Sequence, residues 1–73
     1  MKNTAEQAEE YLEKLEQLII KYFDKSKAEE LIKLLRERYA FKYIFTEFGR
    51  LGIYNEMTKE ENEECGDIIK FFI

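Results

Sequence analysis

The residues that interrupt helices are almost missing from this 73-residue chain, and that absence most restricts its fold. Proline does not occur, and the only glycines stand at positions 49, 52 and 66. Glu, Lys, Leu and Ile, which are abundant here, are compatible with long helices. The sequence therefore predicts an all-α protein.

Three sites carry the pattern of a helix N-terminus, in which Ser or Thr precedes Glu or Gln by three positions. These pairs are Thr4 with Gln7, Ser26 with Glu29, and Thr58 with Glu61. We expect helices at about 4–23, 27–48 and 59–72. The short turn at 24–26 folds the second helix back on the first. Residues 1–73 are thus expected to form a single domain, a small three-helix bundle built from a helical hairpin and a shorter C-terminal helix.

The expected helix at 27–48 has apolar residues on two nearly opposite faces. The first face is formed by Ala28, Leu31, Ile32, Leu35, Tyr39 and Tyr43, and it matches the apolar face of the first helix. The second face is formed by Leu34, Phe41, Ile44, Phe45 and Phe48. Burying the second face is worth about 10 kcal/mol, so it must be covered.

Two kinds of cover are possible for the second face. The loop after residue 48 and the third helix can cover it within a monomer, or a second subunit or target protein can cover it. The apolar C-terminal residues Phe71, Phe72 and Ile73 favour the second possibility, because consecutive helical residues point in different directions. We predict a homodimer whose protein interface includes the second face, Phe71 and Phe72.

An alternative fold remains open for the middle of the chain. Tyr39, Phe41, Tyr43 and Phe45 also stand at every second position, and aromatic residues favour strands. A hairpin at 39–54 would then give an α+β fold.

The small size of the chain also favours a partner. A domain of this length buries only about 60% of the surface of its unfolded chain. Cys65 is the single cysteine and histidine is absent, so neither an intrachain disulfide nor a Cys/His zinc site stabilises it. With no apolar run long enough for a membrane span or signal peptide, we expect a cytoplasmic protein without membrane association.

A second candidate site is the acidic segment near the C-terminus. It contains six carboxylates opposed by Lys59 alone: Glu56, Glu60, Glu61, Glu63, Glu64 and Asp67. We call these six residues the acidic ridge. The ridge is either a solvated face or a surface aimed at a basic groove of another protein.

The sequence lacks the residues and motifs that most often carry out catalysis, which argues against an enzyme. Without histidine there is no Ser/His triad, and the sequence has no phosphate-binding glycine loop and no calcium loop, so we expect no cofactor and no metal. An acidic net charge of −4 argues against direct nucleic-acid binding. We expect a non-enzymatic interaction module of the inhibitor, antidote or adaptor type. The alternative is an acidic mimic of nucleic acid, such as a phage-borne inhibitor of a host defence protein.

Overall fold

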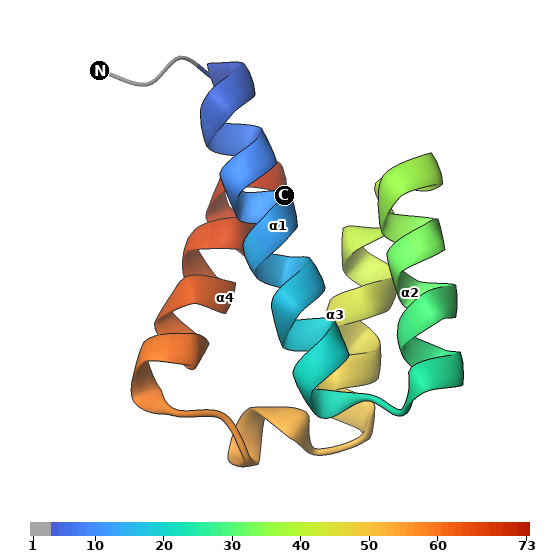
Figure 1. Ribbon diagram of the computed structural model, residues 1–73. Helices are drawn as coiled ribbons and strands as arrows, with labels where there is room; N and C mark the ends of the chain where they lie inside the picture. Colours follow the sequence, from blue (N-terminus) through green and yellow to red (C-terminus); the bar gives the residue numbers. More distant parts are fainter. Residues whose placement is uncertain (1–3) are drawn as a thin grey trace.

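The computed structural model describes residues 4–73, and all regular structure in this range is helical. The elements are α1 (Thr4–Tyr22), α2 (Lys25–Arg38), α3 (Phe41–Arg50), the 3₁₀ turn η1 (Ile53–Asn55) and α4 (Lys59–Phe72). Successive helices run up and down, with α4 beside α1 and α3 beside α2 (Figure 1). The all-α class predicted from the sequence is confirmed, and residues 41–50, where a strand was the alternative, are helical.

The hairpin between α1 and α2 forms as expected, but the residue that begins α2 differs. Asp24 is the N-cap, and its side chain accepts a hydrogen bond from the Lys27 amide at 2.8 Å. The predicted cap, Ser26, lies inside the first turn of α2. Aspartate and serine are both good N-caps, but only Ser26 stands three positions before a Glu, so the capping-box spacing favoured Ser26 over Asp24.

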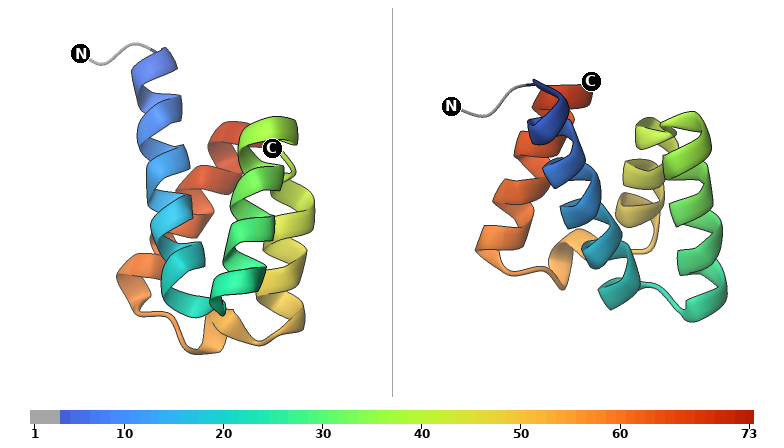
Figure 2. Two further views of the ribbon diagram at one scale, coloured as in Figure 1. Left: turned by 45° about the vertical axis from the view of Figure 1, so that its right-hand side comes forward. Right: turned by 45° about the horizontal axis from the view of Figure 1, so that its top comes forward.

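The helix predicted at 27–48 is divided into α2 and α3. Tyr39 ends α2 in the left-handed conformation, with φ 51° and ψ 44°, and α3 begins at Phe41. The chain thereby reverses, and α3 lies against α2 (Figure 2). The physical reason is burial, because this reversal turns the second apolar face toward the other helices.

The core lies between all four helices and η1. Among residues 4–73, sixteen apolar residues are buried in it, and Leu15, Ile19, Leu31, Leu35, Ile44, Phe48 and Ile68 are fully enclosed. Phe48 is central, with its ring centroid 5.4 Å from that of Phe23, which directly follows α1, and 5.8 Å from that of Tyr54 in η1. The core therefore joins both ends of the chain to its middle.

Candidate protein interaction surface

The predicted interface residues divide into a buried set and an exposed set. Phe41, Ile44, Phe45 and Phe48 are all at most 7% exposed within one copy of the chain. Leu34 and Phe72 are half-buried, and Phe71 is 38% exposed. The monomer therefore covers most of the second face by itself, and Phe71 is the most exposed of the predicted interface residues.

An aromatic cluster lies at the end of the molecule where α1 begins and α4 finishes. The rings of Phe41 and Phe72 are stacked, with centroids 4.2 Å apart. Tyr11 lies 5.1 Å from Phe71, and Tyr39 lies 6.1 Å from Phe41. The cluster therefore draws residues from α1, the α2–α3 junction, α3 and α4.

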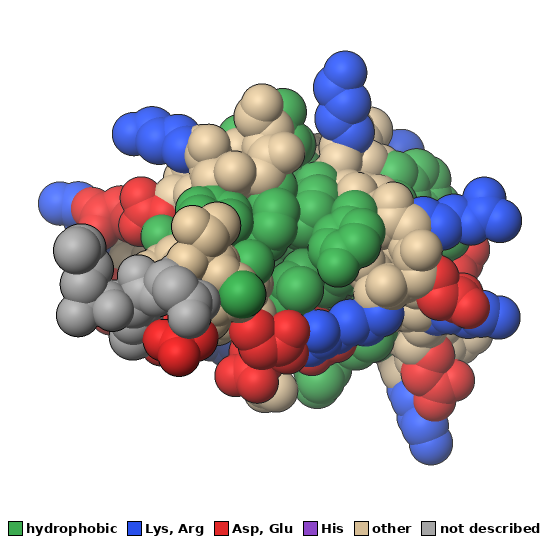
Figure 3. All heavy atoms as spheres, turned by 90° about the horizontal axis from the view of Figure 1, so that it is seen from above, with side chains coloured by type: hydrophobic (Ala, Val, Ile, Leu, Met, Phe, Trp, Pro, Cys, Tyr) green, Lys and Arg blue, Asp and Glu red, His purple; other side chains and the backbone are tan. Residues whose placement is uncertain are grey.

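We define the aromatic end as this cluster together with the C-terminal residue: Tyr11, Tyr39, Phe41, Phe71, Phe72 and Ile73. Seen end-on, hydrophobic side chains gather in the middle of this face between the pair α1 and α4 and the pair α2 and α3 (Figure 3). Tyr39 and Ile73 are 59% and 62% exposed, which makes them the most exposed large apolar residues among those described. Buried rings thus support exposed apolar side chains at one end of the bundle.

Tyr39 was missed as an interface residue by sequence reasoning. A continuous helix would place it on the first face, against α1. The break after Arg38 instead leaves it projecting at the aromatic end. No glycine or proline near position 39 signals the break.

Charged residues tie the two N-terminal helices together. The guanidinium of Arg36 on α2 donates to both oxygens of Glu16 at 2.6 and 2.9 Å, and to Glu9 at 3.1 Å. These carboxylates raise the pKa of Arg36 above its already high value. Such a bidentate pair fixes the relative position of α1 and α2 more firmly than a single lysine contact.

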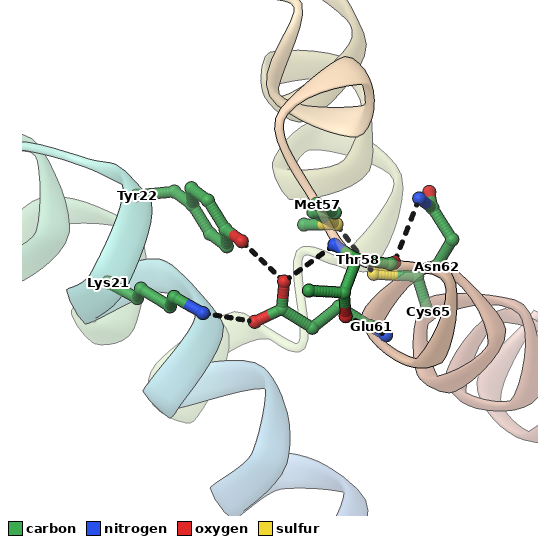
Figure 4. A network of polar contacts seen from close by, with 7 residues as sticks. All are labelled: Lys21, Tyr22, Met57, Thr58, Glu61, Asn62 and Cys65. Atoms are coloured by element: carbon green, nitrogen blue, oxygen red, sulfur yellow. Dashed lines mark hydrogen bonds and ion pairs between the residues drawn. The ribbon is translucent and has the colours of Figure 1, made fainter.

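The six residues of the acidic ridge do not form one continuous surface, because the carboxylate of Glu61 bonds to residues of α1. One oxygen of Glu61 accepts from the Thr58 amide at 2.9 Å and from the Tyr22 hydroxyl. Its other oxygen lies 2.7 Å from Nζ of Lys21 (Figure 4). The Glu61 amide in turn donates to Oγ1 of Thr58, so the capping box predicted here is confirmed. Glu61 therefore fastens the start of α4 to the end of α1.

The bonds to Glu61 also set its ionisation. Hydrogen bonds from Lys21 and Tyr22, in that order, lower the pKa of the Glu61 carboxyl from 4.5 to about 2. The same contacts raise the pKa of Lys21 and of Tyr22. Glu61 is thus held as a carboxylate at neutral pH.

An open groove runs between α1 and α4, and its lining combines ridge residues with carboxylates of α1. The acidic lining residues are Glu10, Glu13, Glu16, Glu60, Glu61 and Glu64, accompanied by Lys14 and Lys21. Glu56, Glu63 and Asp67 are exposed and lie outside this lining. The structure therefore divides the ridge into a groove side and an outer side.

Cys65 lies in the core. It is 2% exposed, and its Sγ is 3.9 Å from Sδ of Met57. Burial raises the pKa of the Cys65 thiol from 9.0 to about 11, so the thiol stays protonated and weakly nucleophilic at neutral pH. Among residues 4–73 no group of three or more Cys, Asp or Glu side chains is placed to hold a metal ion.

None of the helices described here combines the length and apolar character needed to cross a membrane. No protein family, curated protein or solved structure matches this chain. The surfaces described above are therefore the basis for assigning a function.

Proposed function

We propose that this protein is a non-enzymatic helical module that binds a target protein through its aromatic end, in the manner of an inhibitor, antidote or adaptor. The observation that carries the proposal is the exposure of Tyr39, Phe71 and Ile73 at one end of a bundle whose other large aromatic residues are mostly covered. Exposed apolar side chains grouped on one face are typical of a contact surface.

The packing beneath the exposed residues supports the same function. The stacked rings of Phe41 and Phe72 lie under the surface and fix the positions of Tyr39 and Phe71, which contact them. A surface that is already ordered loses little conformational entropy when it binds. Tyrosine adds a hydroxyl that can hydrogen-bond at the edge of an apolar contact, and it is common among residues that dominate binding energy.

The test is selection of binding peptides from a displayed random library, followed by measurement of their affinity for matched variants. Phe71→Ser and Tyr39→Ser each remove an exposed ring from the aromatic end. Ile20→Ser is the control, because Ile20 is 55% exposed on α1 and does not belong to the aromatic end. We expect a loss of about tenfold or more for the two aromatic variants and no loss for the control. Peptides that depend on Ile20 and ignore both rings would contradict the proposal.

The alternative, an acidic mimic of nucleic acid, is favoured by the groove between α1 and α4. Carboxylates from two helices face this groove, which gives a broader acidic surface than the ridge sequence predicts. A basic target would be attracted to this acidic surface over a distance that salt ions limit by screening the charges. The alternative predicts that the protein displaces DNA from a basic nucleic-acid-binding protein, and that added salt or the changes Glu60→Lys and Glu64→Lys abolish displacement. Displacement that is insensitive to salt would exclude this alternative.

A further inference from the structure

The break between α2 and α3 occurs at residues that do not break helices. The local sequence is Arg38, Tyr39, Ala40 and Phe41, without glycine, proline or asparagine. Tyr39 is the only residue other than glycine with a positive φ in the described part of the chain. An L-residue with a β-carbon is disfavoured in the left-handed region, where glycine is normally found. Local preference thus opposes the observed conformation.

The start of α3 is also poorly stabilised by its own residues. Ala40 has φ −78° and ψ 54°, an inverse γ-turn in which the Phe41 amide donates to the Tyr39 carbonyl at 2.8 Å. No side chain caps α3, and its first turn contains no acidic residue. In a continuous helix, the amides of residues 40–43 would instead donate to the carbonyls of residues 36–39. The backbone would therefore gain hydrogen bonds if α2 and α3 joined.

Contacts between two halves of the chain maintain the break. The half formed by α1 and α2 meets the half formed by α3, η1 and α4 through the ring pair of Phe23 and Phe48, at 5.4 Å. The halves also meet through the 2.9 Å ion pair of Lys27 with Glu47. The bonds from the end of α1 to Glu61 add a third connection. Each of these contacts joins a residue before position 39 to a residue after position 40.

Each half also has internal contacts, which do not depend on the conformation of residues 39 and 40. Arg36 holds α2 to α1 through Glu16 within the first half. Phe41 stacks on Phe72 within the second half. Two copies could therefore exchange second halves and keep both the internal contacts and the contacts between halves.

We propose that residues 38–40 are a hinge and that the chain forms a dimer by exchanging the half that contains α3 and α4. In this dimer α2 and α3 form one helix from residue 25 to residue 50, about 39 Å long at 1.5 Å per residue. The second half of each chain then packs on α1 and α2 of the other chain. Exchange of identical elements is a low-cost route to a dimer, and a strained hinge favours it.

The first test compares Tyr39→Gly with Tyr39→Ala. Both changes remove the exposed ring, so they match in every respect except the β-carbon. Glycine accepts the left-handed conformation and favours the monomer, whereas alanine favours the continuous helix. The difference corresponds to about tenfold for each hinge, and a dimer contains two hinges. After refolding at millimolar concentration, we expect the dimerisation constant of Tyr39→Ala to exceed that of Tyr39→Gly by about a hundredfold. Equal constants, or monomers for both variants, overturn the proposal.

The second test measures whether a dimer contains the continuous helix. Spin labels are attached at the exposed positions Glu30 and Thr46 on a Cys65→Ala background, and labelled chains are diluted with unlabelled chains so that only distances within one chain are recorded. In the monomer these positions flank the ion pair of Lys27 and Glu47, so the distance is short. In the exchanged dimer it is about 24 Å along the helix. A dimer that retains the short distance overturns the exchange.

A third comparison separates this proposal from binding by the aromatic end. Phe71→Ser weakens the aromatic end but leaves the hinge intact, so the exchanged dimer should persist in this variant. Two results together would instead assign the dimer contact to the aromatic end: Phe71→Ser is monomeric, and the wild-type dimer keeps the short distance between the labels at positions 30 and 46. Failure of the exchange would then leave the proposed binding function standing.

Discussion

Nζ of Lys27 lies 2.9 Å from Oε1 of Glu47, which is the only buried charged residue in the described part of the chain. Arg50 contacts the same carboxylate at 2.7 Å, so two cations surround it. Glu47 is buried next to the core residue Phe48, and the two cations explain why a glutamate is tolerated there. The pair joins the start of α2 to the end of α3 and helps to hold these helices side by side.

Removing the Glu47 carboxylate should destabilise the fold. In Glu47→Ala, Lys27 loses its closest partner and α3 loses a connection to α2. The midpoint of thermal unfolding, followed by circular dichroism, should fall. Glu47→Gln, which retains hydrogen-bonding atoms of similar shape, should lie between wild type and Glu47→Ala. An unchanged midpoint in Glu47→Ala would show that the ion pair contributes nothing.

The stability contributed by Glu61 should depend on pH. Its pKa is about 2 in the folded protein, lowered from 4.5 mainly by the hydrogen bond from Lys21. Because the folded pKa is the lower one, this contribution is fully present above about pH 4.5 and is lost as the pH falls toward 2. The difference in unfolding free energy between wild type and Glu61→Gln should therefore shrink over that interval.

Urea unfolding at a series of pH values measures this difference. Glu63→Gln is the control, because it removes the same charge from an exposed position on α4. A gap between wild type and Glu61→Gln that stays constant from neutral pH to pH 2 would contradict the assigned role of Glu61.

Core and surface phenylalanines should respond differently to truncation. Phe48 is fully buried, so Phe48→Ala should cost about 3–5 kcal/mol, a large part of the stability of a small domain. Phe71 is 38% exposed, and Phe71→Ala should cost much less. Chemical denaturation of both variants, monitored by helical circular dichroism, measures the difference.

Phe45 belongs to the interface predicted from the sequence, but in the structure it is a core residue, so we expect Phe45→Glu to prevent folding and not only assembly. Phe45 is 7% exposed in a single copy, and a carboxylate at this site would have to be buried or would force α3 away from the core. We expect a largely unfolded chain, seen as a loss of helical circular dichroism. A folded monomeric variant would show that α3 is not held as described.

The capping box of α4 should contribute about 1 kcal/mol through Thr58. In Thr58→Ala the Glu61 amide loses the hydroxyl that accepts its hydrogen bond at 3.1 Å. Thr58→Ser keeps the hydroxyl and should be nearly as stable as the wild type. Equal stability of the alanine and serine variants in urea unfolding would argue against the cap.

The helical class and the N-terminus of α4 were determined by the sequence alone. Few breakers, strong helix formers and the spacing of Thr58 to Glu61 are local signals, and local signals can be found in a single chain. The buried residues of α1 are Leu12, Leu15, Leu18 and Ile19, and their spacing of three or four positions is likewise a local amphipathic pattern. These properties depend on neighbours within one or two helical turns.

Tertiary structure decided where the middle of the chain reverses. Nothing at Tyr39 or Ala40 favours a break, and the gain from burying Phe41 and Phe48 outweighs the local preference for helix. The same long-range packing exposed Tyr39, surrounded Glu47 with cations and bonded Glu61 to α1. Such features involve residues 20 to 40 positions apart, as in the pairs Lys27 with Glu47 and Lys21 with Glu61. Periodicity along the sequence carries no information on which of these distant residues meet.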